Sequence, residues 1–235
     1  PNKGKPMKIT VPSKDITIFA QEITVPFTVP EKIATVPSYE LEVPNQPVGF
    51  RLYSPESFWN KKLYDIQQIQ AIDFATEVWE NVKIAGVSVN TIKYSRPIYF
   101  VTDSTPYKAV KLVKNGVALT GRIADEFLKG IPLPANVVIS SGTDGHLCII
   151  NITTGIEYNL WKLFLNTTTN EWQASNGGII WDISNSNGTQ QRFSVWNSAT
   201  ATHLPLAGGT IMLHELIKGI IPHCIAIALN RPKKY

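Results

Sequence analysis

The 235-residue sequence predicts a mainly β domain, a β-sandwich or jelly roll, with one or two peripheral helices and an extended N-terminal arm. Three observations lead to this prediction. Short apolar runs of strand length recur along the chain, and loops rich in Asn, Ser, Thr and Gly separate them. Prolines crowd into the first 47 residues. A helical period occurs in two stretches only, so the helices are expected outside the sheets.

Residues 1–47 form the predicted arm. Eight of the sixteen prolines fall there, mostly after valine. Proline lacks an amide hydrogen and pushes the preceding residue into extended conformations, which favours edge strands. We expect a stalk, linker or edge-strand arm joined to a domain at 48–235. The alternative is that the arm is a strand-rich part of that domain.

Two segments of the domain have a helical period. Residues 64–82 place apolar side chains at i, i+3, i+4 and i+7 spacing. A shorter helix is predicted over 122–129, ending at Gly130 with Pro132 beyond it. The remaining apolar runs predict strands at 96–102, 109–114, 137–140, 146–152, 157–165, 178–183, 210–213 and 224–229.

Composition excludes several classes of function. The net charge is +4, from 22 basic and 18 acidic residues, and no basic face typical of a nucleic-acid-binding protein is concentrated in the sequence. No apolar run reaches the roughly 20 residues of a membrane-spanning helix. The sequence contains no phosphate-binding loop, dinucleotide fingerprint or Gly-x-Ser-x-Gly elbow. We therefore predict no nucleic-acid partner, no membrane span and no cofactor.

The two cysteines and nearby histidines do not form a metal motif. Cys148 and Cys224, with His146 and His223, are ligand types that zinc accepts, but their spacing is not that of a zinc finger or ribbon. His214-Glu215 lacks the second histidine of a metalloprotease helix. We predict no metal site and two buried thiols, with a disulfide as the alternative.

The strongest candidate for a catalytic motif is the string Gly142-Thr143-Asp144-Gly145-His146. Its glycines allow a tight turn into a strand. Asp144 and His146 are two residues apart, so on extended backbone they share a face, where the carboxylate raises the basicity of the imidazole. The functional interpretation is an acid/base pair. The structural alternative is a turn Asp and a packed His.

Aromatic and hydroxyl side chains offer a binding surface. Indole rings suit the C–H-rich faces of sugars, and Thr200 and Thr202 can hydrogen-bond a substrate. The alternatives are that the tryptophans are core residues and that the threonines stabilise a turn. Four of the six tryptophans lie close together in the sequence: Trp161, Trp172, Trp181 and Trp196.

Six strings, taken in order, resemble those of an uncharacterised family of secreted proteins common in actinobacteria. The resemblance covers about residues 50–230 and implies a jelly-roll or concanavalin-like sandwich that acts on polysaccharides. The strings are Ser57-Phe58-Trp59-Asn60, Gly142 to His146, Leu160-Trp161, Trp172-x-Ala174-x-x-Gly177-Gly178, Ala199-Thr200-Ala201-Thr202-x-Leu204-Pro205-Leu206-x-Gly208-Gly209, and Glu215-Leu216 with Gly219-x-Ile221-x-His223.

One position departs from the resembling sequences. They often carry an acidic residue two before the equivalent of Trp161, and here that residue is Asn159. Glu157 lies two residues earlier and shares a strand face with Asn159. Glu157 either substitutes for the missing carboxylate or is an ordinary rim charge. A chain lacking that carboxylate binds without cleaving if the carboxylate is catalytic in the relatives.

Three hypotheses follow for the function. The first is a glycan-recognising module that acts as a glycoside hydrolase, with catalytic residues Asp144, His146 and Glu157 and substrate-binding residues Trp161, Trp172, Asn159, Thr200, Thr202 and His223. A polysaccharide lyase is the weaker version, since few basic residues follow Lys129. The second is a non-enzymatic attachment module whose stalk joins a fibre or a homo-oligomer. The third is a purely structural virion protein.

Location is predicted from composition. The Ile-, Asn-, Thr- and Tyr-rich sequence with its Val-Pro stalk is similar to surface proteins of thermoacidophilic archaea and to attachment fibres of their viruses. We therefore predict an extracellular, cell-surface or virion-surface protein. Its three N-x-S/T sequons, at Asn151, Asn166 and Asn187, are candidate glycosylation sites.

Overall fold

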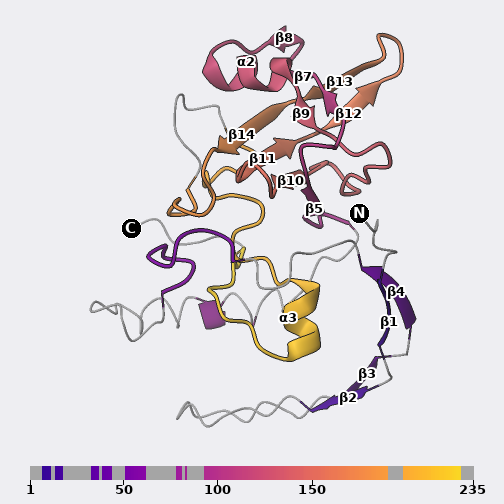
Figure 1. Cartoon of the computed structure of the whole chain (residues 1–235), viewed down its shortest axis with the longest axis vertical. Helices are drawn as coiled ribbons and strands as arrows, with labels where there is room; N and C mark the ends of the chain where they lie inside the picture. The colour runs from indigo at the N-terminus through magenta and orange to yellow at the C-terminus, as the bar shows by residue number, and fades with distance from the viewer. Residues whose placement is uncertain are drawn as a thin grey trace. The chain divides into compact units, whose positions relative to one another are not determined.

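The computed structural model describes residues 7–11, 14–17, 33–36, 39–43, 51–61, 78–80, 83, 93–189 and 198–228 (Figure 1). Contacts divide the chain into two units, Pro1–Phe50 and Arg51–Tyr235, and each is described by itself. The described residues are mainly β with few helices, which confirms the predicted class. None of their helices has the length and apolar character needed to cross a bilayer.

The first unit contains two short antiparallel ladders. Strand β1 (Met7–Val11) pairs with β4 (Tyr39–Val43), and β2 (Lys14–Thr17) pairs with β3 (Ile33–Val36). The ladders stop at Val11 and Val36, and a Pro-Ser pair follows each valine in the sequence. Proline has no amide hydrogen to donate to a ladder, so the sequence places a non-donor at matching positions after the two strands.

The second unit contains two four-stranded sheets, each with one parallel pair. The central sheet has the order β14-β11-β10-β5, and its strands are β5 (Ile98–Val101), β10 (Leu147–Asn151), β11 (Ile156–Trp161) and β14 (Asn176–Ile180). The outer sheet has the order β12-β13-β7-β8, and its strands are β7 (Val110–Lys114), β8 (Val117–Ala118), β12 (Phe164–Asn166) and β13 (Glu171–Ala174). The parallel pairs are β10 with β5 and β13 with β7. A further short pair joins β6 (Tyr107–Lys108) to β9 (Ile131–Pro132).

One apolar core is shared by the two sheets and helix α2 (Arg122–Lys129), which lies beside β7 in Figure 1. The helix ends at Gly130, as predicted, and buries Ile123, Ala124 and Phe127. Two sheets that close over one core form a sandwich-like arrangement. The fully buried core residues include Val110, Leu112, Phe127, Leu147, Ile149, Leu160 and Ala174.

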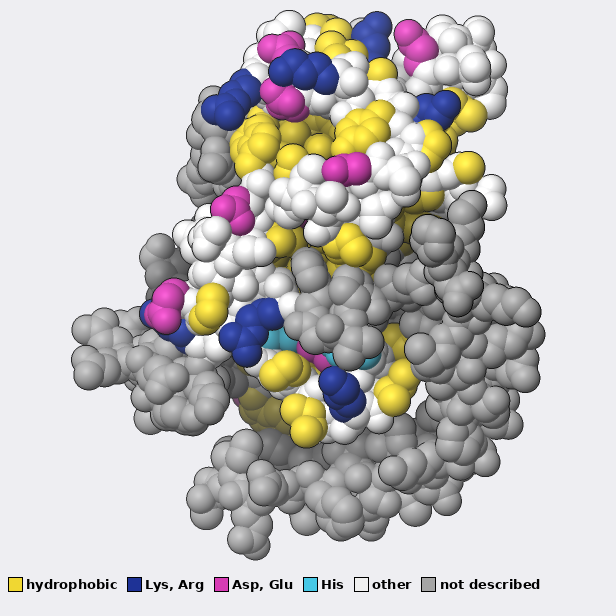
Figure 2. Space-filling model, viewed as in Figure 1, with side chains coloured by type: hydrophobic (Ala, Val, Ile, Leu, Met, Phe, Trp, Pro, Cys, Tyr) yellow, Lys and Arg dark blue, Asp and Glu magenta, His cyan; other side chains and the backbone are white. Residues whose placement is uncertain are grey.

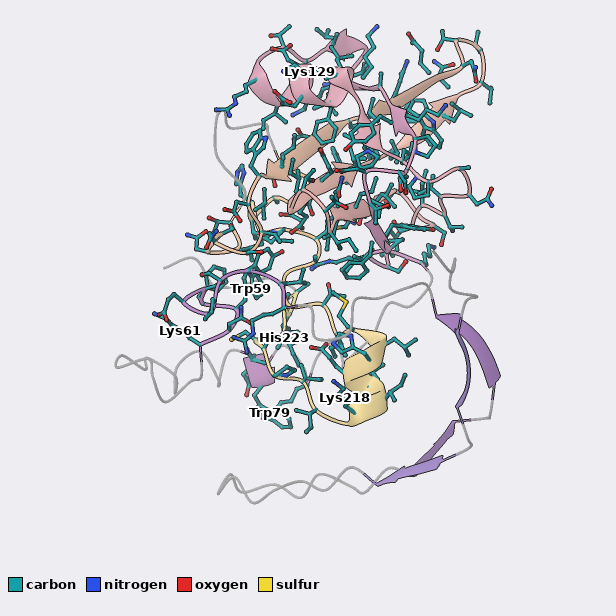
Figure 3. The ribbon with its side chains drawn as sticks, in the orientation of Figure 1. Trp59, Lys61, Trp79, Lys129, Lys218 and His223 are labelled. Atoms are coloured by element: carbon teal, nitrogen blue, oxygen red, sulfur yellow. The ribbon has the colours of Figure 1, made fainter. Side chains whose placement is uncertain are left out.

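Glycines in two of the sequence strings have packing roles. A Cβ at Gly177 would lie 2.7 Å from the Phe127 ring, so any larger residue there would displace α2 from the sheet. The Trp59 ring, 5% exposed, packs in the same way against Gly208, and its indole nitrogen donates to the Gly188 carbonyl over 3.0 Å (Figure 3). These strings therefore stabilise the fold around Phe127 and Trp59.

Three predicted strands are wrong. Residues 137–140 are irregular because the Val138 amide donates to the Tyr99 hydroxyl and not to a ladder. Residues 210–212 lead into helix α3 (Leu213–Lys218), whose first turn is capped by its own Glu215. Residues 224–228 are also irregular, and Cys224 donates its amide to the Trp59 carbonyl. The predicted strand 157–165 is broken into β11 and β12 at Lys162, which has a positive φ of 53°.

The predicted helix at 64–82 lies mostly outside the described residues. Residues 78–80 and 83 are helical. Within them, the Lys83 ammonium lies 2.8 Å from Glu80 and 5.8 Å from the centre of the Trp79 ring.

The sequons differ in accessibility. Asn151 is fully buried, and its side-chain oxygen accepts the amides of Thr153 and Thr154. Asn166 and Asn187 also accept amides two residues ahead, but they lie on partly or fully exposed turns. The Asn151 sequon is therefore a buried turn, and the other two remain candidate glycosylation sites.

Candidate functional site

Strand alternation brings several predicted site residues to one face of the central sheet. Side chains two apart on a strand point to the same side. Cys148 on β10 lies opposite Asn159 on β11, and Glu157 lies two residues before Asn159. These three side chains are fully buried and define the polar face. The apolar face, which belongs to the core, comprises Leu147, Ile149, Tyr158, Leu160 and Ile179.

Two distant segments cover the polar face and bond to several of its polar atoms, although Asn159 Nδ2 has no hydrogen-bond partner among the described residues. The Tyr53 hydroxyl donates to Glu157 Oε2 over 2.9 Å, and the Cys148 thiol lies 3.5 Å from Glu157 Oε1. The Leu206 amide donates to Asn159 Oδ1 over 2.7 Å. Tyr53 has a positive φ of 67°, a conformation that is costly for an aromatic residue. The hydrogen bonds of the polar face therefore hold both covering segments in place.

Burial sets the protonation of the polar face. Desolvation raises the pKa of the Glu157 carboxyl, and the hydrogen bond from Tyr53 and the nearby side-chain amide of Asn159 oppose this shift. Burial, followed by the charge of Glu157, raises the pKa values of the Cys148 thiol and the Tyr53 hydroxyl well above their usual range. A cysteine nucleophile requires a thiolate. Cys148 is therefore a hydrogen-bonding thiol and not an activated nucleophile.

The predicted Asp144–His146 pair lies at the end of β10, in a turn that contacts two other segments. Gly142 and Gly145 have positive φ values of 98° and 46°, which explains both glycines. The Lys162 amide donates to the Asp144 carbonyl over 2.8 Å. His146 is half-buried, and its own amide donates to the hydroxyl of Ser140 over 2.8 Å. The turn is thus fixed against the end of β11.

The hydrogen bonds of His146 define its tautomer. Its Nε2 lies 3.2 Å from the Ala199 carbonyl, which can only accept, so Nε2 carries the proton. Its Nδ1 is buried and forms no hydrogen bond within the described part of the chain, and in this tautomer Nδ1 is an acceptor. Burial lowers the pKa of His146; the Ala199 carbonyl and Asp144 oppose this shift, and the charge of Arg96 adds to it. His146 is therefore neutral at pH 7, and the lone pair of its Nδ1 is buried.

A partly exposed surface surrounds this turn. Tyr94 donates its amide to the Ser141 carbonyl over 2.9 Å, and its ring packs on Gly142. A lysine ammonium lies over each of the two aromatic rings on the surface. Lys93 Nζ is 5.5 Å from the centre of the Tyr94 ring, and Lys162 Nζ is 4.5 Å from the centre of the Trp161 ring. We define the turn surface as Lys93, Tyr94, Asp144, His146, Trp161 and Lys162.

The other predicted binding residues have different positions. The Thr200 hydroxyl donates to the Leu204 carbonyl over 2.7 Å, which favours the turn interpretation, and Thr202 is exposed. Both belong to the segment that contacts His146 through Ala199. Trp172 on β13 packs against the apolar core, away from the polar face. Asn159 is a buried hydrogen-bond acceptor for Leu206.

His223 belongs to a second polar pair, with Glu215 of α3 (Figure 3). Its Nε2 lies 3.0 Å from the Glu215 carboxylate, and its Nδ1 lies 2.8 Å from the Cys224 carbonyl. Glu215 is the buried residue of α3, and it also accepts the Met212 amide over 2.7 Å. Apolar side chains on and around α3 are exposed, namely Ile211, Leu216, Ile217 and Ile220. Figure 2 shows hydrophobic side chains on the surface of the region where Figure 1 draws α3. The Glu215–His223 pair therefore ties α3 to the segment that follows it.

The carboxylates predicted to face each other do not share an open surface. Glu157 is 0% exposed and bonded to Tyr53, whereas Asp144 is half-buried at the turn. Asp182 lies on an exposed turn, where Asn185 donates to both of its oxygens. These hydrogen bonds lower the pKa of Asp182. The two residues proposed as partners of Asp144 are thus in a buried network and in a separate turn.

Three residues of the site were not identified from the sequence. Tyr53 and Cys148 belong to the polar face, and Arg96 lies beside it. In the parallel β5–β10 register Ile98 pairs with Cys148, which brings Arg96 next to His146. The charge of Arg96 acts on both His146 and Cys148. Only the pairing of strands far apart in the sequence reveals this neighbourhood.

The cysteines and histidines do not gather into a metal site in the structure. In the described ranges no group of three or more His, Cys, Asp or Glu side chains is placed to hold a metal ion. Cys148 is buried and Cys224 is half-buried, and both are free thiols. The expected pair of thiols is confirmed, although Cys224 is less buried than predicted.

Comparison of the chain with protein-family models, with curated proteins and with solved structures gives no match.

Proposed function

We propose that the Arg51–Tyr235 unit recognises a surface glycan without hydrolysing it. The distribution of carboxylates carries this proposal. Glycoside hydrolysis uses two carboxyl groups that flank the scissile bond, about 5–10 Å apart, and both must reach the substrate. Glu157 is fully buried beneath Tyr53, and Asp182 is on an exposed turn of its own, so neither supports Asp144 in that role.

Asn159 supports the same proposal. It occupies the position at which the resembling sequences often carry a carboxylate. Its Oδ1 accepts the Leu206 amide, and its side chain has no exposed surface. This position thus helps to hold the covering segment and does not supply an acid or base.

The turn surface is suited to recognition. Trp161 and Tyr94 are partly exposed rings on which the apolar face of a sugar can stack. Asp144 offers a carboxylate, and Thr202 offers an exposed hydroxyl nearby. Sugars are recognised by this combination of aromatic faces with hydrogen-bonding groups. Trp172 packs on the core and is left out of the proposed surface.

The finer description of the protein is also part of the proposal. The shared core of the two sheets supports a jelly-roll or concanavalin-like sandwich, although the parallel pairs β5–β10 and β7–β13 are additions to the antiparallel pattern of those folds. We place this sandwich on the outside of a cell or virion. The proline-punctuated ladders of the first unit would then be the stalk that joins it to a larger assembly.

The test is a glycan array probed with the full chain, followed by mass spectrometry of every bound glycan. We expect binding with no new reducing ends and no unsaturated products. Trp161→Ala should abolish binding, whereas Phe164→Ala, which removes an exposed ring from β12 of the outer sheet, should not. Cleaved products would overturn the non-hydrolytic assignment. Silence across the array, or equal binding by both variants, would overturn recognition at the turn surface.

A further inference from the structure

Arg96 is a half-buried cation that has no hydrogen-bond or ion-pair partner among the described residues. It precedes β5, and the register of Ile98 with Cys148 puts it at the His146 end of the polar face. A guanidinium has five donors in a rigid fork, and structures rarely leave such a group partly desolvated and unpaired.

The partial burial of Arg96 has an energetic consequence. Desolvation lowers the pKa of the guanidinium because the charged form loses water, and Cys148 opposes this shift only in part. An anion at this position would replace the stabilisation of the charged guanidinium that is lost with its water. A planar carboxylate or a sulfate ester matches the guanidinium fork, since both can accept two parallel N–H bonds.

The groups around Arg96 narrow the class of anion. Lys93 and Lys162 add two exposed ammonium groups to the turn surface, and Asp144 is its single carboxylate. Each lysine lies over an aromatic ring, so a sugar ring stacked there would place an anionic substituent near a cation.

We propose that the turn surface binds an acidic glycan and that Arg96 pairs with its carboxylate or sulfate group. This inference rests on the proposed function and names its ligand class. Lys93 and Lys162 flank the anion. Arg96 and Lys93 thus add basic residues from an earlier segment of the chain to the few that follow Lys129.

The experiment uses two matched pairs of probes on the full chain. Oligogalacturonate is compared with its methyl ester, and dextran sulfate is compared with dextran, by calorimetry at low and high salt. We expect one acidic member to bind at least about tenfold more tightly than its neutral counterpart, with an affinity that falls as salt rises. The pair that shows this difference identifies the anion as a carboxylate or a sulfate.

Variants then locate the anion. Arg96→Gln should remove the preference for the acidic probe, and Arg96→Lys should retain part of it because the charge remains without the fork. Lys111→Gln, an exposed cation on β7 of the outer sheet, is the matched control and should change nothing. Because no described residue pairs with Arg96, Arg96→Gln should unfold at the wild-type temperature. Protection of the wild type, but not of Arg96→Gln, by the acidic probe in a thermal melt provides a second readout.

The outcomes separate the two proposals. Equal binding of acidic and neutral probes, with Arg96→Gln unchanged, would overturn the role of Arg96 and leave glycan recognition standing. An acidic preference that Arg96→Gln retains would overturn Arg96 as the anion partner. If neither member of either pair binds, the acidic-glycan inference falls, and the array decides the fate of glycan recognition separately.

Discussion

The two faces of the central sheet are buried to the same extent, but one of them carries polar side chains beside its apolar ones, Ile150 and Ile180. On the apolar face Leu147, Ile149 and Leu160 are fully buried against α2 and the outer sheet. On the polar face Cys148, Glu157 and Asn159 have equally little exposure beneath the two covering segments. One face is satisfied by any close-packed hydrocarbon, and the other requires a specific donor for each buried atom.

The apolar face stabilises the domain, whereas the polar face determines where its covering segments lie. Burial of hydrocarbon is favourable by itself, whereas a buried carboxyl is costly until a donor reaches it. Tyr53, more than a hundred positions away in sequence, supplies that donor to Glu157. The polar face therefore fixes the position of its two covering segments, and the second of them contacts His146 at the turn surface.

The largest effect is expected on the apolar face. Leu160→Ala removes a fully buried side chain from the core and should lower the free energy of unfolding by about 2–5 kcal/mol. Urea denaturation measures the loss. Val117→Ala, at a side chain 67% exposed on β8, should stay within about 0.5 kcal/mol of the wild type. Equal losses for both variants would mean that the apolar face is not the principal core.

The second largest loss of stability is expected on the polar face, when a second carboxyl is placed there. Asn159→Asp keeps the acceptor for Leu206 but places a second carboxyl beside Glu157, so we expect a loss of roughly 1–3 kcal/mol at pH 7 that shrinks in acid. Asn166→Asp, whose oxygen accepts turn amides on the outer sheet, is the matched control and should be nearly neutral. The same Asn159→Asp protein should release no reducing ends from a bound glycan. Gained hydrolysis would show that the carboxylate position of the resembling sequences is catalytic here too.

The sequence predicted the fold class and the elements whose signals are local. The helix at 122–129 was correct because its apolar spacing and its Gly130 stop are contained within it. The strands at 137–140 and 210–213 failed because distant or capping groups satisfy their backbones, namely the Tyr99 hydroxyl and the Glu215 carboxylate. Period-two patterns do not reveal such competition.

The site was predicted in part for the same reason. The face shared by Glu157 and Asn159 follows from strand alternation, and so does the neighbourhood of Asp144 and His146. The parallel pairing that brings Arg96 beside His146 has no local signal. Nor could alternation show that the face bearing Glu157 is covered, because a polar residue at every second position is the usual mark of a solvent-facing strand. Trp172 was misleading since it alternates toward the core.

A pair of tyrosines compares hydrogen bonding on the two faces directly. Tyr53→Phe removes the donor to buried Glu157 and should lower the free energy of unfolding by about 1–2 kcal/mol. Tyr158→Phe on the apolar face removes a hydroxyl with no hydrogen bond in the described chain, so its effect should be within about 0.5 kcal/mol. Both are measured by urea denaturation. A larger loss for Tyr158→Phe would reverse the assignment of the two faces.

The smallest effect concerns the pH dependence of the polar face. The pKa of Glu157 is raised above its ordinary 4.5 by burial, so between that pH and its raised pKa the folded state binds more protons than the unfolded state. The contribution of Glu157 to stability is therefore full below pH 4.5 and is lost as the pH rises through this window. Glu157→Gln keeps an acceptor for Tyr53 and removes the titration, so its stability should fall less steeply with pH, and at pH 7 it should lie within about 1 kcal/mol of the wild type.

Asp182, whose pKa is shifted in the opposite direction, provides the control for the pH dependence of stability at Glu157. Asp182 has a lowered pKa because Asn185 donates to it, so its contribution is present above its ordinary 3.8 and is lost as the pH falls through its lowered pKa. Asp182→Asn should therefore alter stability only in strong acid and leave the window of Glu157 unchanged. Unfolding free energies measured from pH 3 to pH 8 distinguish the two variants. A Glu157→Gln slope identical to that of the wild type would mean that the carboxyl is solvated, and that the polar face opens far more readily than the apolar face behind it.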